Sequence, residues 1–332
     1  MRYPAAALPF GEARQPAWSG VVLALAKRGL MALLTVFITT IVVFAAVEVL
    51  PQDPARAALG IDSTAAQRAA FRHQYGLDQP ALERYFHWLG GLLHGRFGNS
   101  VISHQPIAQD LWPRLQNTAT LAVIAIAISL VIGIPLAVRA AQKPGRFFDT
   151  AANFASVSAS AVPEFVLGMV LSYIFASELG WLPVLSDGVD SGQLAGLVLP
   201  SVTLGLGAVS YVFRFARVGV IEISQAPHIR AAILRGTPRR RITYRHILPL
   251  AAATVVNVVA LNAIYLLGGV IVVENLFAYP GLGTLLLSGV SDNDLPTIEA
   301  VAVVTATLLV TINLVADMVV VVLNPRLRSG GR

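Results

Sequence analysis

Six long apolar stretches, separated by polar segments, dominate the hydropathy pattern of this chain. They cover approximately residues 29–50, 115–138, 148–177, 194–215, 250–273 and 300–323. An α-helix rises about 1.5 Å per residue, so about 20 apolar residues cross the roughly 30 Å hydrocarbon core of a bilayer. The pattern therefore predicts an all-α polytopic membrane protein with six transmembrane helices.

Composition agrees with this interpretation. The chain is 55% hydrophobic and 13% charged, whereas a typical soluble domain is about 25% charged. The absence of cysteine excludes disulfides and thiolate metal sites. A net charge of +6 could indicate nucleic-acid binding, but the arginines gather at the ends of the predicted spans. Retention of positive loops in the cytoplasm already explains them there.

The charges between the apolar stretches predict how the chain is oriented. Cations follow the second stretch, and the segment 217–249 after the fourth is strongly basic. Segments 178–193 and 274–299 contain acids but neither lysine nor arginine. Because positive loops stay on the cytoplasmic side, the basic segments and both termini are predicted to be cytoplasmic. Residues 51–114, with nearly balanced charges, are then the long outer loop.

Two segments outside the spans have patterns of their own. Residues 1–26 are rich in alanine and proline and are interpreted as a cytoplasmic extension. The following stretch is longer than the apolar core of a signal peptide, so an uncleaved anchor is predicted. In the outer loop, an amphipathic helix is predicted from Ala81 to Leu93, on the membrane surface or against the spans. Its expected apolar face consists of Leu82, Tyr85, Phe86, Leu89 and Leu93.

The basic segment between the fourth and fifth stretches carries the strongest motif. No acidic residue occurs from Arg230 to Pro249. Ala231 and Ala232 are expected to leave a bare helical face that another protein can approach closely. Gly236 and Pro238 then break this helix, and a second short helix is predicted to follow.

This segment resembles the cytoplasmic motif of binding-protein-dependent ABC importers. That motif reads Glu-Ala-Ala, three residues, Gly, nine residues, Ile, one residue and Leu-Pro. The chain matches it at Ala231, Ala232, Gly236, Leu248 and Pro249. It departs from the motif at the first position and at the isoleucine.

Both departures are typical of the peptide-permease branch of the family, which often has Arg-Thr-Ala…Gly…Arg-His. Arg230, Arg245 and His246 resemble that branch. The resemblance covers about residues 27–328. Further stretches that resemble the branch are 50–54, 75–80, 95–100, 274–277, 280–283 and 324–326. In the last of these the branch usually has Asp-Pro-Arg, where this chain has Asn-Pro-Arg.

The resemblance implies the type I ABC importer transmembrane fold, with residues 217–249 as the cytoplasmic loop that couples to the ATPases. It also implies a permease subunit that imports dipeptides, oligopeptides or a related solute such as a nickel chelate. The expected partners are a second homologous permease, two ABC ATPase subunits and an external substrate-binding protein. The expected location is a bacterial-type inner membrane.

The chain itself lacks a nucleotide-binding motif. Its only lysines, Lys27 and Lys143, do not follow the glycine pattern of a phosphate-binding loop. We therefore predict that it is not an enzyme and binds no cofactor or metal, and that ATP and Mg²⁺ bind the partner ATPases. No internal repeat is evident either, so a two-fold symmetric pathway requires a second permease chain.

Several polar residues fall within the predicted spans. Glu164, beside Pro163, is unfavourable there, because the free energy of inserting an ionisable group at mid-membrane is about 2.5–3.5 kcal/mol on insertion scales. It could line the translocation pathway and bind a cationic end of the substrate, or cap the backbone freed by the proline. Pathway lining and hydrogen bonding between helices are both open for the remaining polar residues, Asn257, Asn262, Asn313 and Asp317.

Two other functional classes are compatible with the sequence alone. An ion-coupled secondary transporter would use Glu164 and Asp317 as coupling sites and would need no ATPase. A channel subunit would need no coupling loop. ATP dependence of uptake distinguishes the first alternative, and co-purification with an ATPase distinguishes the second.

Overall fold

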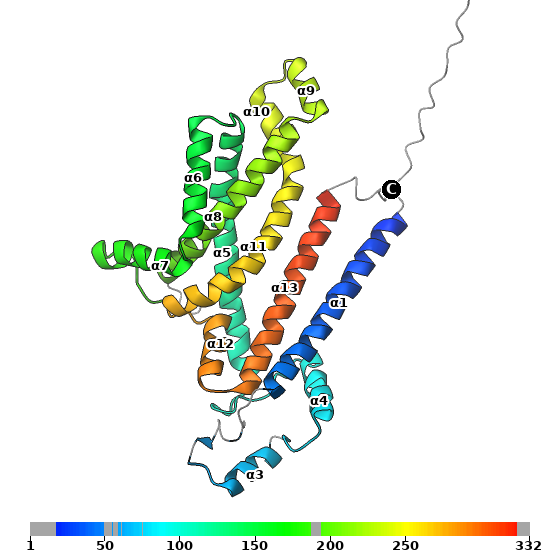
Figure 1. Cartoon of the computed structure of the whole chain (residues 1–332), viewed down its shortest axis with the longest axis vertical. Helices are drawn as coiled ribbons and strands as arrows, with labels where there is room; N and C mark the ends of the chain where they lie inside the picture. The colour runs from blue at the N-terminus through cyan, green and yellow to red at the C-terminus, as the bar shows by residue number, and fades with distance from the viewer. Residues whose placement is uncertain are drawn as a thin grey trace, which may run out of the picture.

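The computed structural model describes residues 18–49, 55, 59–60, 62–74, 76–186 and 194–323. Within these residues the chain consists of α-helices, two π-helical segments and connecting turns, with no extended strand. Figure 1 shows the long helices side by side, with the shorter ones gathered at the two ends. Of the predicted extension 1–26, residues 1–17 lie outside the described residues, and residues 18–26 are helical. The stretch 324–326 also lies outside the described residues.

The predicted spans correspond to helices. In the described part of the chain, four helices contain stretches long and apolar enough to cross a membrane: α1 (Trp18–Val49), α5 (Ile107–Ala141), α8 (Ala195–Ser224) and α13 (Leu295–Leu323). The fifth predicted stretch lies within α11 (Leu248–Leu276), a helix of 29 residues.

The third predicted stretch is not a straight span. It forms α6 (Phe147–Ala161), then α7 (Glu164–Ser172) with the π-helical segment η1 (Tyr173–Glu178), and the two parts are bent by 95°. Pro163 has no N–H to continue α6, and it holds Val162 in an extended conformation with ψ of 123°. As Figure 1 shows, α7 leaves the bundle sideways.

The core lies where α5, α8 and α11 pack together. Its buried side chains include Leu121 and Ala125 of α5, Leu204 and Ala208 of α8, and Val270 of α11. A Cβ at Gly205 of α8 would lie 2.8 Å from Ile128 of α5. The glycine therefore permits a close approach of these two helices, as small residues do at many helix interfaces in membranes.

Helices α1 and α13 form a pair beside this core. Much of α1 is apolar and exposed, including Leu30, Leu33 and Val42, as expected for a surface that meets lipid or another membrane subunit. Arg28 of α1 forms an ion pair with Asp317 of α13, with 2.9 Å between Nη1 and Oδ1. The starting residue of α1 and the final residue of α13 lie at the same end of the molecule (Figure 1).

The other end of the α1–α13 pair carries the segments of the predicted outer loop, α3 (Ala65–Gln74) and α4 (Ala81–Leu93), and also α12 (Leu282–Ser291). The predicted bounds of α4 are confirmed. Tyr85, however, does not share the exposed face of Leu82 and Phe86. It is buried against α1, where its hydroxyl lies 2.9 Å from that of Thr40.

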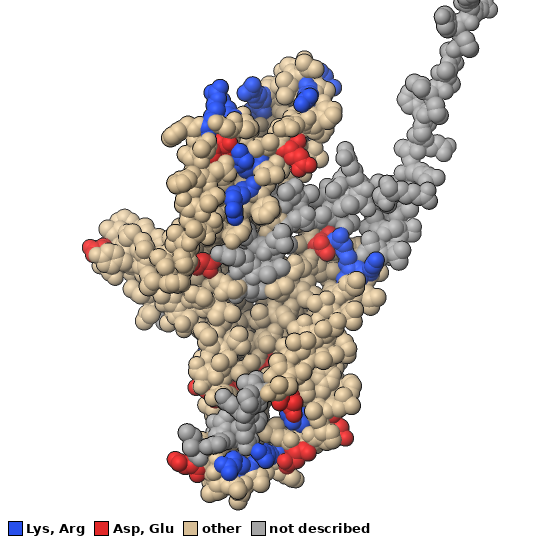
Figure 2. Space-filling view, viewed as in Figure 1, with Lys and Arg blue, Asp and Glu red and all other residues tan. Residues whose placement is uncertain are grey.

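Charge distinguishes the two ends of the molecule. Lys and Arg gather at the end formed by α9 (Pro227–Leu234), α10 (Arg239–Ile242) and the turn between α5 and α6, which we call the basic end (Figure 2). Lys, Arg, Asp and Glu are mixed at the opposite end. The start of α1 and the end of α13 are directed toward the basic end of the molecule (Figure 1).

Candidate functional site

The basic motif folds as two short helices joined by a tight turn. Pro227 is the first residue of α9. A backbone N–H at this position has no acceptor within the helix, so proline loses no hydrogen bond there. At the other end of α9, Thr237 N–H donates to Ala232 O at 3.2 Å and Gly236 N–H donates to Ile233 O at 2.9 Å. These two bonds form a Schellman motif, which satisfies the last carbonyls of the helix.

Gly236 adopts the left-handed conformation that this motif requires, with φ of +73°. No atom lies within 4 Å of the position that a Cβ would occupy. The turn therefore needs glycine for its backbone conformation, and there is space for a side chain. The segment then continues through α10 and the π-helical segment η2 (Thr243–Ile247) into α11.

The two alanines of the motif face in different directions. Ala232 is only 4% exposed and packs in a cluster with Ile229, Ile242 and Val138, whereas Ala231 is exposed. The expectation that both leave a bare face is therefore wrong for Ala232. The physical reason is that neighbouring residues of an α-helix point about 100° apart, so a docked helix turns only one of them outward.

The outer face of α9 is instead formed by larger apolar residues. Ile233 is 55% exposed and Leu234 is 88% exposed, although both are apolar and lie at the basic end of the molecule. Arginines and a histidine lie near them in the chain, and all of these side chains are exposed: Arg230, Arg235, Arg239, Arg240, Arg241, Arg245 and His246. We call Ile233 and Leu234 together with these basic residues the docking face.

Sequence reasoning missed Ile233, Leu234 and the nearby Tyr244, which is 61% exposed. An available signal was the pair of bulky apolar residues beside arginines. The last two motif residues contribute to the fold. Leu248 is partly buried and packs against the cluster that contains Ala232, and Pro249 lies in the first turn of α11.

A charged pair holds the helices beneath the docking face together. Arg217 of α8 donates from Nη2 to Oδ2 of Asp149 of α6 at 2.6 Å, and from Nε to the other carboxylate oxygen. The same carboxylate accepts from Gly145 N–H at 2.8 Å. Asp149 is buried. The pair thus ties the turn between α5 and α6 to the helix that leads into the motif.

Glu164 lies at the bend between α6 and α7, where three helices meet. Its Oε1 would be 3.4 Å from a Cβ at Gly207 of α8, and its carboxylate would overlap a Cβ at Gly269 of α11. The carboxylate is therefore inside the helical assembly, and two glycines leave space for it.

Two of the remaining polar residues of the spans, Asn313 and Asp317, form contacts away from Glu164. Asn313 donates to the Leu309 carbonyl of its own helix at 3.0 Å, and Asp317 pairs with Arg28. Figure 1 shows α7 and α13 on opposite sides of α11. The side chains of Asn257 and Asn262 lie outside the described residues.

A second buried carboxylate is found at the end of α11. Glu274 is fully buried and accepts hydrogen bonds from Thr118 Oγ1 at 2.6 Å and from Gly283 N–H at 2.7 Å. It also accepts a longer bond from Thr284 N–H. The two N–H groups belong to the first turn of α12, where a negative charge is favourable. Glu274 therefore joins the ends of α11 and α12 to α5.

Neighbouring contacts reinforce this junction. The Tyr279 hydroxyl donates to Asn117 O at 2.8 Å, and the Asn117 amide donates to Pro280 O at 2.9 Å. A Cβ at Gly281 or Gly283 would collide with the Glu274 carboxylate. Residues 274–277 and 280–283, noted in the sequence only for their resemblance, therefore form a structural junction of three helices.

The fold and the motif together define a class of protein. This is a multi-pass, all-α membrane protein, with the short motif helices α9 and α10 at its basic end. Models of two protein families match the chain. One is described as binding-protein-dependent transport system inner membrane component and covers residues 133–329. The other describes the N-terminal part of such membrane components and covers residues 22–122. The chain belongs to this family.

Individual relatives agree. The chain is 35% identical over 302 residues to the glutathione transport system permease protein GsiC of Escherichia coli K12, covering 91% of this chain and 97% of GsiC. GsiC of Salmonella typhi gives the same identity and coverage. Among solved structures, the MetNI methionine ABC transporter matches with a TM-score of 0.53 and 20% identity, over 63% of this chain and 94% of the MetNI chain. That likeness shows a shared fold, the type I ABC importer transmembrane fold.

The protein is therefore a permease subunit of a binding-protein-dependent ABC importer and resides in the inner membrane. The predicted fold class and functional class are confirmed. The family is a membrane component and is not itself catalytic. Nothing in the comparisons supports an ion-coupled transporter or a channel.

Proposed function

We propose that this chain forms part of the pathway of a peptide importer, and that its docking face receives an ATPase subunit. The supporting observation is the exposed apolar pair Ile233 and Leu234 within a segment whose arginines are also exposed. Apolar anchors with a charged rim are typical of protein interfaces, where the rim steers the encounter. ATP and Mg²⁺ are bound by the partner ATPases in this proposal.

The assembly that we propose follows the family. A second, homologous permease completes the pathway, two ATPases bind at the basic end, and a substrate-binding protein delivers substrate to the opposite end. The basic end and both chain termini are then cytoplasmic, as positive-inside retention requires. The relatives are named as glutathione permeases, and this favours a peptide-like substrate over a nickel chelate.

Coupling follows from how the docking face is anchored. Ala232 and Ile229 on the inner side of α9 pack against Val138 of α5 and Val220 of α8. Closely packed interiors transmit displacement, because they deform little. When ATP binding draws the ATPases together, a push on α9 therefore moves the basic ends of α5 and α8. These two helices reach the other end of the membrane.

The proposal is tested by changing Leu234, whose side chain makes the most exposed apolar contact of the docking face. In the complete importer reconstituted in proteoliposomes, Leu234→Glu should reduce co-purification of the ATPase and lower ATP-driven dipeptide uptake by at least tenfold. Leu185→Glu, at an exposed apolar position outside the docking face, is the matched control and should leave ATPase binding unchanged. Normal ATPase binding and uptake in the Leu234 variant would exclude this face as the coupling surface.

We also propose that Glu164 lines the translocation pathway and contacts the positively charged end of the substrate. A carboxylate inside a membrane protein is costly and is usually kept for function. Glu164→Gln preserves the shape and removes the charge, so it should lower uptake while assembly and basal ATPase activity stay intact. Loss of the protein from the membrane would instead assign Glu164 to the bend beside Pro163, and unchanged uptake would remove it from the pathway.

A further inference from the structure

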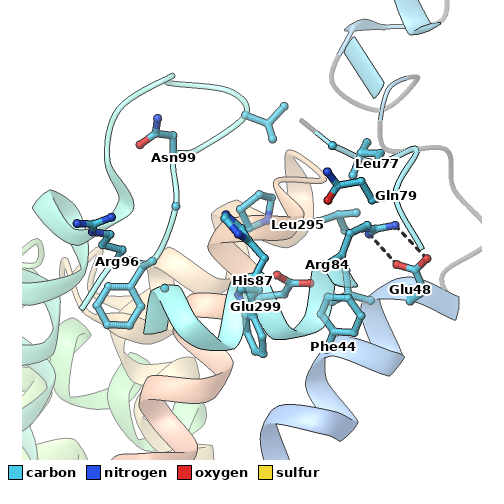
Figure 3. Close-up of a pocket in the computed structure, with 18 of the residues that line it drawn as sticks. Phe44, Glu48, Leu77, Gln79, Arg84, His87, Arg96, Asn99, Leu295 and Glu299 are labelled. Atoms are coloured by element: carbon cyan, nitrogen blue, oxygen red, sulfur yellow. Dashed lines mark hydrogen bonds and ion pairs between the residues drawn. The ribbon is translucent and has the colours of Figure 1, made fainter. Parts of the chain in front are cut away.

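A large cavity lies at the end of the molecule opposite the basic motif. Its volume is about 1330 Å³, which exceeds the roughly 300–1,000 Å³ of many small-molecule sites. The walls come from the last turn of α1, from α3 and α4, from residues 96–101 and from the first turns of α13. Figure 3 shows residues that line it.

One wall presents the carboxylate of Glu299. Arg84 directs both terminal nitrogens to Glu48, at 2.7 and 3.1 Å, and not to Glu299. Within the described part of the chain, Glu299 forms no hydrogen bond or ion pair. In Figure 3 its carboxylate lies between His87 and Arg84, which is turned away toward Glu48. Trp88 and Phe44 line the same cavity, and aromatic faces attract cations.

The opposite wall presents a cation. Arg96 and Asn99 lie across the cavity from the Glu48–Arg84 pair (Figure 3). The Arg96 guanidinium has no hydrogen-bond or ion-pair partner among the described residues. Its planar group of N–H donors suits a carboxylate or a phosphate, which it can bind with two parallel bonds.

We propose that this cavity binds a zwitterionic small molecule, with its ammonium group on Glu299 and its carboxylate or phosphate group on Arg96. A single charge would satisfy only one of the two walls. A metal ion is a poor fit, because the described residues contain no group of three or more His, Cys, Asp or Glu that could hold one. The aromatic rings accommodate the apolar part of the ligand.

Two sources can supply this chemistry. A free peptide or amino acid carries an ammonium and a carboxylate. A phosphatidylethanolamine headgroup carries an ammonium and a phosphate, and it would reach the cavity from the membrane alongside α1. The site is separate from the docking face and from Glu164, so the inference does not depend on the proposed coupling mechanism.

Binding of a free zwitterion is measured on the complete importer in nanodiscs, without the binding protein, with dialanine as the probe. Glu299→Gln removes a charge-assisted hydrogen bond, and such a bond corresponds to about a tenfold or larger loss of affinity. Arg96→Gln should weaken binding similarly. Glu83→Gln, an exposed acid on the same helix as Arg84 but outside the cavity, is the matched control. N-acetylated dialanine amide, which lacks both charges, should not bind.

The lipid source is tested by native mass spectrometry of importers from nanodiscs that contain phosphatidylethanolamine or, as a comparison, only phosphatidylglycerol. Retained phosphatidylethanolamine should fall severalfold in Glu299→Gln and in Arg96→Gln, but not in Glu83→Gln. Dialanine binding that depends on both residues identifies a free ligand, and lipid retention that depends on both identifies the headgroup. If neither ligand responds to either substitution, the inference is wrong. Arg96 is exposed, so its variant answers the question even if Glu299→Gln fails to fold.

Discussion

At the scale of single residues, the structure separates the roles that the sequence motif combined. Ala232 fixes α9 to the protein, Ala231 and Leu234 face outward, and Gly236 shapes the turn. A substitution at Ala232 to glutamate would therefore place a charge inside an apolar cluster and disturb the motif from within. It cannot by itself report on the ATPase contact, whereas a change at the outward residues can.

Gly236 allows backbone strain and charge to be separated. Asparagine and aspartate have nearly the same shape, and both tolerate the left-handed conformation better than other residues with a side chain. We expect Gly236→Asn to keep most ATP-driven uptake. Gly236→Asp should lose most of it, because the carboxylate reduces the positive charge of the docking face. Gly236→Val should destabilise the turn by about 1–2 kcal/mol.

Uptake in proteoliposomes measures this series, and ATPase co-purification serves as the second readout. Equal loss in the asparagine and aspartate variants would show that any side chain at this position is harmful, and that charge is not the cause.

At the scale of helices, the sequence predicted the spans better than their contacts. Runs of apolar residues were sufficient to place α1, α5, α8, α11 and α13, since a membrane requires them to be long and apolar. Pro163 indicated an interruption, but the direction of α7 depends on packing. At Gly168, α7 packs closely against two other helices, since a Cβ there would lie 3.3 Å from Thr203 of α8 and 2.6 Å from Leu276 of α11. The pattern of residues within α7 alone does not show which helices it contacts.

Polar contacts between distant segments were also beyond the sequence. Glu274 and Thr118 are 156 residues apart in the chain, yet they form one of the shortest hydrogen bonds of the structure at 2.6 Å. In the sequence, Arg217 is only the first residue of the basic segment 217–249, and its pairing with Asp149 depends on how α6 and α8 approach one another. The candidate docking face was located by its motif, but its outward residues were identified only from the orientation of α9.

The Asp149–Arg217 pair is expected to stabilise the contact between α6 and α8. Removing one partner of a buried pair leaves an uncompensated charge, and this typically costs 3–5 kcal/mol. Asp149→Asn and Arg217→Gln should each lower the thermal unfolding temperature in detergent. The double variant should be less destabilised than the sum of the two, because it leaves neither charge alone.

The matched control for this pair is Glu83, an exposed acid of α4 outside the spans. Surface substitutions of this kind usually change the free energy of unfolding by no more than about 0.5 kcal/mol, so Glu83→Gln should change the unfolding temperature little. Additive effects of the two substitutions at Asp149 and Arg217 would contradict a direct energetic coupling.

At the scale of the whole molecule, the separation of charge predicts the orientation in the membrane. The turn at Gly145 and the motif turn at Thr237 lie at the basic end, whereas Asp292 follows α12 at the opposite end. Reporter fusions should therefore read cytoplasm at Gly145 and Thr237 and the outer side at Asp292. A cytoplasmic reading at Asp292 would contradict the orientation, and with it the proposed places of the ATPases and of the binding protein.

The junction at Glu274 also constrains how this family can vary. The carboxylate occupies the volume in which a side chain at position 281 or 283 would stand, so the three positions cannot drift independently during evolution. A relative that acquires alanine at either glycine must shorten or displace the acid at the same time, and one that loses the acid no longer needs the glycines. In an alignment of homologues, substitutions at these three positions should therefore appear together, as a single inherited unit rather than as three separate events.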